Sequence, residues 1–157
     1  MIPKPAGGTV AVSNRQRRLK IDTKLLARIA QQARELLDDT DGELSIVLVD
    51  DAMIARLNAQ YHATPGPTDI LSFDYGEGQG ELIISVEHAV AQARRFRTTP
   101  ARELVLYVVH GILHLHGHDD LALRDRRRMH ATQRRMMACL AKKFEFRGVF
   151  IGRITNR

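Results

Sequence analysis

The pattern of apolar and polar positions predicts a small set of strands. Residues 9–13 alternate as a short strand does, and residues 43–49 form a nearly continuous apolar run typical of a strand in the middle of a sheet. Residues 70–74 and 81–85 flank a short glycine-rich segment, which predicts a β-hairpin. Residues 62–69 contain two prolines and a glycine, so we expect a loop there.

Amphipathic helices are predicted between these strands and after them. They cover about residues 23–37, 51–61 and 86–96, and each follows an Asp, Thr or Ser that can serve as N-cap. A last helix, about residues 121–144, has an inward stripe whose methionines we assign to core packing and not to a ligand site; the stripe is Met129, Gln133, Met136, Met137 and Leu140. With the helix described next, this order predicts an α+β fold, a single domain over residues 1–157 with a small mixed β-sheet packed with about five helices.

The stretch after residue 98 has the most unusual composition. Thr99 and Pro100 are typical of a helix start, and residues 104–115 are almost all apolar, which predicts a helix buried nearly all round. At about 100° per residue, four of its ionisable side chains fall within one sector of about 60°. These are Glu103, Tyr107, His110 and His114. A buried helix with a single ionisable stripe suggests a site along that stripe.

The two histidines of this stripe indicate a metal site. His110 and His114 are four residues apart and can bind one ion from one helical face. Gly117 can end the helix in a left-handed conformation, and Asp120 could then return to the same ion. Three protein ligands and an open position are typical of catalytic zinc, so we predict Zn²⁺, about one ion per chain, and no small-molecule cofactor. Two hydrogen-bonded core histidines are the alternative.

Charge and composition indicate which class of partner the protein binds and in which cellular compartment it works. The formal net charge of +6 and the pI of about 10.0 favour polyanions, above all nucleic acid, although solubility alone is an alternative. A single cysteine, Cys139, excludes an internal disulfide and suits a reducing compartment. The N-terminus lacks the apolar core of a secretory signal, and no apolar run is long enough for a membrane span. We therefore expect a cytoplasmic protein without a membrane partner.

Four segments, in this order and at these spacings, resemble the YbeY family of bacterial endoribonucleases. They are L-N-A-Q-Y (57–61), P-T-D-I-L-S-F (67–73), G-E-L-I-I-S (80–85) and H-G-I-L-H-L-H-G-H-D (110–119). The resemblance covers about residues 9–144, and residues 145–157 are a C-terminal extension to the family pattern. It implies an α+β fold, a metal usually taken as zinc, and single-strand-specific endoribonuclease activity. The implied roles are maturation of the 3′ end of 16S rRNA and late-stage ribosome quality control, with single-stranded rRNA and the small ribosomal subunit as partners.

The resemblance also assigns roles to residues. The first two histidine ligands of the family fall on His110 and His114, and the third falls on Asp120, with His118 as a second candidate. An aspartate oxygen can bind zinc at a similar distance, but it lowers the net charge of the zinc unit. The family's characteristic arginine falls on His62, which we predict to be catalytic together with His114. A protonated histidine could hold a phosphate in part, and histidine could also act as acid or base.

These residues support one leading function and two rivals. The leading hypothesis is a metal-dependent endoribonuclease whose substrate contacts are Thr68, Asp69 and Ser72. The second is a ribosome-assembly or RNA-binding factor with weakened or lost catalysis, which the departures at positions 62 and 120 motivate. A metallopeptidase is the weakest, because Gly111 stands where H-E-x-x-H enzymes carry their glutamate base.

Overall fold

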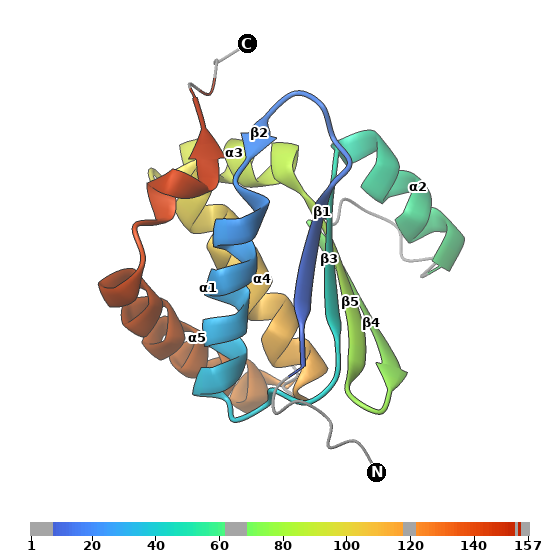
Figure 1. Cartoon of the computed structure of the whole chain (residues 1–157), viewed down its shortest axis with the longest axis vertical. Coiled ribbons are helices and arrows are strands. Elements are labelled where there is room, and N and C mark those ends of the chain that lie inside the picture. The colour runs from blue at the N-terminus through green and yellow to red at the C-terminus, as the bar shows by residue number, and fades with distance from the viewer. Residues whose placement is uncertain (1–7, 62–68, 118–121, 153, 155–157) are drawn as a thin grey trace.

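A mixed four-stranded sheet forms the centre of the protein (Figure 1). The computed structural model describes residues 8–61, 69–117, 122–152 and 154. The strands lie in the order β1 (Val10–Asn14), β3 (Leu44–Val49), β5 (Gln79–Ser85) and β4 (Ile70–Gly76). β1, β3 and β5 are parallel, and β4 pairs with β5 as the predicted antiparallel hairpin. β3 lies between β1 and β5, as its apolar sequence predicts.

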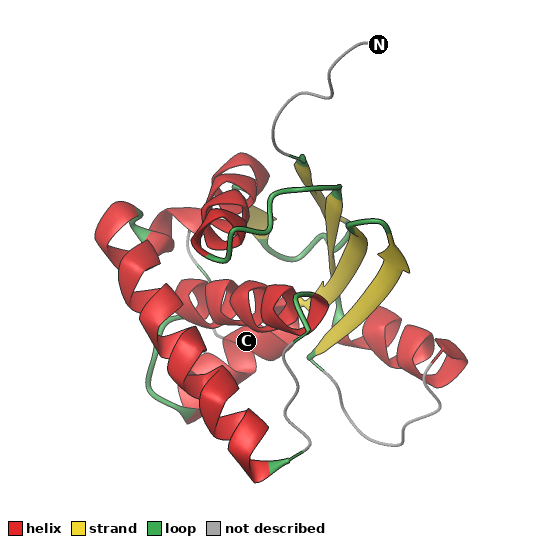
Figure 2. Ribbon diagram, turned by 90° about the horizontal axis from the view of Figure 1, so that it is seen from below, coloured by secondary structure: helices red, strands yellow, loops and turns green. Residues whose placement is uncertain are grey.

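Helices cover both faces of this sheet. α1 (Thr23–Leu36) and α4 (Pro100–Leu115) lie against one face, and α3 (Val86–Arg95) and α5 (Leu123–Lys143) pack on α4. α2 (Asp51–Tyr61) lies on the opposite face of the sheet from the other helices, as Figure 2 shows from below. The expected α+β fold, with a small mixed sheet and five α-helices among the described residues, is therefore the one observed.

α4 is the most buried helix of the fold. Leu104, Val105, Val108, Val109 and Leu113 are fully buried in the main apolar cluster, which confirms the prediction of a helix surrounded on nearly all sides. The energetic gain from burying such side chains is about 1.5–3 kcal/mol each, so this helix contributes much of the core. Among the described residues, no helix is both long and apolar enough to cross a membrane.

Local sequence signals set the ends of the helices. The Thr99 hydroxyl accepts a hydrogen bond from the backbone N–H of Arg102 at 3.2 Å, and Pro100 begins α4 as predicted. Asp22 caps α1 and Asp50 caps α2, each through a carboxylate oxygen that accepts a hydrogen bond from a backbone N–H of the first turn. Gly117 follows the end of α4 with φ of +100°, the left-handed conformation that the sequence predicts there.

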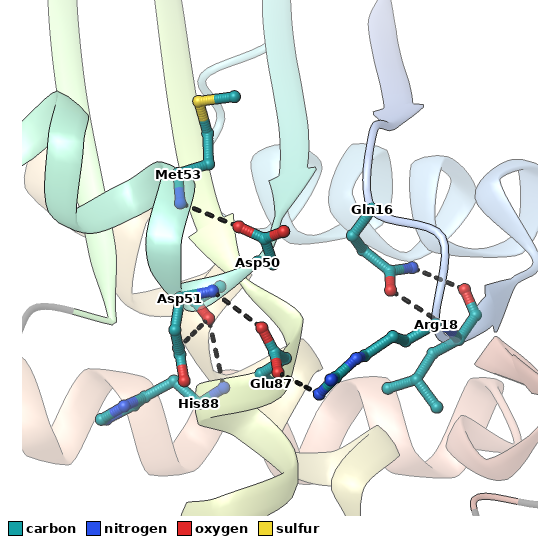
Figure 3. Close-up of polar contacts among 9 residues, drawn as sticks. Gln16, Arg18, Asp50, Asp51, Met53, Glu87 and His88 are labelled. Carbon is teal, nitrogen blue, oxygen red and sulfur yellow. Dashed lines mark hydrogen bonds and ion pairs between the residues drawn. The ribbon is translucent and has the colours of Figure 1, made fainter.

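Polar side chains connect the carboxyl ends of the parallel strands (Figure 3). Glu87 accepts a hydrogen bond from the backbone N–H of Asp51 and pairs with Arg18, each at 3.0 Å. The Ser85 hydroxyl donates to the Asp51 carboxylate and accepts from the backbone N–H of His88. Because these groups satisfy one another, we assign the network to holding the starts of α2 and α3 together.

The chain after residue 144, which the sequence identifies only as an extension to the family pattern, packs on the core. Residues of the 3₁₀ helix η1 (Phe146–Val149) and of β6 (Phe150–Ile151) follow α5, and β6 pairs antiparallel with β2 (Lys20–Ile21). Val149 is fully buried, and its carbonyl accepts a hydrogen bond from the backbone N–H of Asp22 at 2.8 Å. Strands of two residues carry too little periodicity to be predicted from sequence.

Candidate functional site

His110 and His114 lie side by side on one face of α4, one helical turn apart. Their Nε2 atoms are 3.1 Å apart and their ring centroids 4.6 Å apart, and both side chains are half-buried. The helix therefore presents two imidazole nitrogens that converge on one point. This is the arrangement that their spacing in the sequence predicts.

Gln133 on α5 orients the first of these rings. Its Oε1 lies 3.0 Å from Nδ1 of His110. An amide oxygen can only accept, so Nδ1 carries the ring proton and Nε2 keeps its lone pair toward His114. The sequence places Gln133 on the inward stripe of this helix but does not predict its contact with His110. The available signal was a polar amide within the otherwise apolar inward stripe of α5.

The histidine pair fits a zinc ion. Zinc binds imidazole nitrogens at about 2.0–2.1 Å, so two such nitrogens of a tetrahedral site lie about 3.3 Å apart. The observed separation of 3.1 Å is close to this value, and it is also the length of a hydrogen bond between the two rings, which is the alternative that the sequence leaves open. A metal-binding histidine usually donates its other ring N–H to an acceptor, as His110 does to Gln133. The donor pair and its orienting amide thus suit the predicted metal.

The predicted third ligand cannot be placed beside this pair. Asp120 and its alternative His118 lie outside the described residues, as do His62 and Thr68. Within the described residues, no group of three His, Cys, Asp or Glu side chains is positioned to hold a metal ion. The metal assignment therefore stays a prediction that rests on two placed donors.

Gly111 allows α4 to lie directly on the sheet. A Cβ at this position would be 2.6 Å from Cδ1 of Ile70 and 2.7 Å from Cδ2 of Leu82, well inside normal contact. Position 111 therefore points into the interface between α4 and the hairpin, away from solvent. A glutamate there would be forced into this apolar interface, which argues further against a metallopeptidase.

The other end of the polar stripe is a buried acidic group. Glu103 and Tyr107 are 7% and 6% exposed. Burial, and next the negative charge of Asp69, raise the pKa of Glu103, while Arg102 and His88 oppose the shift. Burial raises the pKa of Tyr107 as well, with Asp69 and Glu103 adding to it. Tyr107 therefore stays protonated near neutral pH and can donate a hydrogen bond.

Asp69 and Ser72 bring the predicted substrate-contacting segment to this side of the sheet. The charge of Asp69 acts on both acidic groups of the α4 stripe, and its carbonyl accepts from the backbone N–H of Ser85 at 3.1 Å. Ser72 comes two residues after Ile70, so the two side chains lie on the same face of β4. Ile70 packs against Gly111 of α4, and Ser72 is half-buried on that face. The structure thus assembles β4 and the α4 stripe, although their contact with a substrate stays a prediction.

Comparison with known proteins places this arrangement among relatives. A family model described as Endoribonuclease YbeY matches residues 11–141. A protein named Endoribonuclease YbeY from Pelotomaculum thermopropionicum is 34% identical over 146 residues, which cover 83% of this chain and 96% of the relative. One of the same name from Geobacter metallireducens is also 34% identical, over 145 residues that cover 85% of this chain and 97% of the relative.

A solved structure shares the fold as well. The solution structure of a protein from Thermotoga maritima matches with a TM-score of 0.63 and 25% sequence identity, covering 85% of this chain and 90% of that one. The family match extends over β1 to α5 and includes the histidine pair, Gln133 and the β4–β5 hairpin. On sequence and fold together, this chain belongs to the YbeY family of endoribonucleases.

Proposed function

We propose that the protein is a metal-dependent endoribonuclease that cleaves single-stranded RNA. The observation that carries this proposal is the convergence of the His110 and His114 nitrogens, 3.1 Å apart, in a chain whose relatives are named endoribonucleases. Zinc would be held by these two histidines and by Asp120. The family resemblance further supports a role in 16S rRNA 3′-end maturation and ribosome quality control, on the small ribosomal subunit in the cytoplasm.

The residues of the chain supply position and orientation for this chemistry. When bound, zinc contributes Lewis acidity, which activates water near neutral pH and polarises a phosphoryl oxygen. Gln133 holds the ring proton of His110 on Nδ1, so the Nε2 lone pair faces the site. Gly111 lets α4 rest on the sheet, which fixes the histidine pair relative to β4.

Residues beyond the histidine pair contact the substrate in this proposal. Thr68, Asp69 and Ser72 would contact the RNA in this proposal, and the buried Tyr107 keeps its proton and can donate a hydrogen bond. His62 stands at the position of the family arginine. When protonated it binds a phosphate in part, and when neutral it accepts a proton near neutral pH.

The proposal is tested by measuring metal content and RNA cleavage on the same preparations. We expect about one zinc per chain in the wild type, and its loss in His114→Ala and in Asp120→Ala. His130→Ala is the matched control, because His130 is exposed on α5. The wild type and this control should cut single-stranded RNA and leave duplex RNA intact. A preparation with stoichiometric metal that cleaves no single-stranded RNA under any metal or pH would overturn the proposal.

A second candidate is an RNA-binding or ribosome-assembly factor whose catalysis has weakened or been lost. The observation that favours it is that His62 and Asp120 stand where the family pattern has arginine and histidine. Restoring both, as His62→Arg and Asp120→His, distinguishes the two functions. A large gain in cleavage indicates a decayed site, and a loss indicates that the present residues form a working alternative.

A further inference from the structure

The positive charge of this protein is concentrated on α5. This helix carries eight of the chain's 24 Lys and Arg residues but only one of its 18 Asp and Glu residues. The rest of the chain therefore has 16 basic and 17 acidic residues, a net charge of −1, against +7 on α5. The charge that favours a polyanionic partner is thus a property of one helix and not of the whole surface.

Five arginines form an outer face on this helix. At about 100° per residue they lie opposite the inward stripe that contains Gln133 and contacts α4. All five are exposed, and none forms an ion pair with a carboxylate of the described residues. This arginine face consists of Arg124, Arg127, Arg128, Arg134 and Arg135.

The arginine face is unfavourable for the helix that carries it. Arg124 is three and four residues from Arg127 and Arg128, and like charges at these spacings repel across one helical turn. These cations lie near the helix N-terminus, where the macrodipole favours anions. The N-cap residue, Ala122, offers no side-chain hydrogen bond to compensate. Asp125 in the first turn offsets part of this cost, and an external anion would turn the rest into a favourable contact.

We propose that the arginine face binds the phosphate backbone of the RNA strand whose neighbouring segment occupies the histidine site. This inference rests on the proposed function, because it takes RNA as the substrate. Gln133 contacts His110 from the inner side of α5, so a strand leaving the histidines reaches the arginine face after crossing about one helix width, 10–12 Å. The face is one helix wide and about 16 Å long, which suits a single backbone.

The same geometry defines what these contacts do. α5 contains no Phe, Tyr or Trp, and its one aromatic ring is the imidazole of His130, so it offers little surface on which bases can stack. Contacts from arginines to phosphates position a strand and add affinity, but they carry no sequence information. The arginine face therefore provides salt-dependent affinity, and sequence preference comes from elsewhere in the protein. An RNA duplex presents two backbones on either side of a wide, shallow minor groove and is a poorer match to this narrow strip.

The test compares two triple variants that remove the same charge. One is Arg124→Gln, Arg127→Gln and Arg128→Gln on the arginine face. The control is Arg15→Gln, Arg17→Gln and Lys20→Gln, three exposed residues near β2 at the other end of the molecule (Figure 1). Binding of a fluorescent single-stranded RNA is measured by anisotropy in EDTA, over a salt series from about 50 mM to about 200 mM.

We expect the α5 variant to bind about 10- to 100-fold more weakly than the wild type near 0.1 M salt, because each single-strand phosphate contact adds about 0.7 to the salt slope. Its salt slope should fall by about 2, whereas the control keeps most of the wild-type slope. Melting separates binding from folding, since the α5 variant should keep its Tm or gain about 1–3 °C from the relieved repulsion.

Equal losses in the two triple variants would overturn the proposal, because the effect would then follow net charge alone. Unchanged binding in the α5 variant, or tighter wild-type binding to duplex than to single-stranded RNA, would overturn it as well. These outcomes differ from failure of the proposed function. A wild type that binds through the arginine face but never cleaves RNA leaves this inference standing and removes the nuclease.

Discussion

Gly111→Ala tests the close contact between α4 and the sheet. In an ordinary helix interior this change stabilises by about 1 kcal/mol, because alanine has the higher helix propensity. Here the added Cβ would be 2.6 Å from Cδ1 of Ile70 and 2.7 and 2.8 Å from the two methyls of Leu82. Ordinary carbon contacts are about 3.5–4.0 Å, so three contacts fall short by about 1 Å.

Ile70 is only half-buried and its end methyl can turn aside, but the two Leu82 methyls have no free space to enter. Leu82 is fully buried, and overpacking of this kind typically costs about 1–3 kcal/mol. The steric loss therefore outweighs the gain in propensity, and we expect a net destabilisation of about 1 kcal/mol. This corresponds to a Tm about 2–4 °C lower for a protein of this size. Urea unfolding followed by far-UV circular dichroism measures the change in free energy directly.

Two further variants separate the contributions. Ala138→Gly, at an exposed position of α5, calibrates helix propensity alone and should cost up to about 1 kcal/mol. Leu82→Ala should cost about 2–5 kcal/mol in the wild type but less beside Gly111→Ala, because the new methyl fills part of the vacated space. A Gly111→Ala protein that gains the full propensity benefit, or two substitutions that simply add, would refute the tight contact argued here.

Three other predictions follow from the site and the core. Gln133→Leu should weaken zinc binding by about 10- to 100-fold in a chelator competition, because His110 loses the acceptor that orients its ring. The Tm of this variant should stay within a few degrees of the wild type. Unchanged zinc affinity would show that Gln133 is not part of the site. Glu103→Gln tests the raised pKa of this carboxyl. The Tm of the wild type minus the Tm of the variant should fall as pH rises above 4.5. The reason is that a carboxyl with a raised pKa stabilises the fold when it is protonated and loses that contribution as it ionises. A difference that is constant or grows between pH 4 and 8 would contradict the buried environment. Phe150→Ala should lower the free energy of unfolding by about 3 kcal/mol, whereas Phe96→Ala at an exposed position should change it little. Equal losses would show that the chain after residue 144 does not complete the core.

Sequence alone determined the features that depend on neighbours along the chain. The spacing of His110 and His114 places both rings on one helical face whatever surrounds them, because 3.6 residues complete a turn. The start of α4 at Thr99 and its end before Gly117 likewise follow from capping groups that act within a few residues. The family motifs are of the same kind, because each is a short run of residues at fixed spacing.

Tertiary structure decided the features that depend on residues far apart in sequence. Gln133 is 23 residues from His110, and nothing in the periodicity of α5 distinguishes a core amide from one that orients a ligand. The contact of Gly111 with Leu82, the influence of Asp69 on Glu103, and the return of Val149 to the core depend equally on how the elements pack. Helical periodicity states which residues share a face, but only packing selects what that face meets.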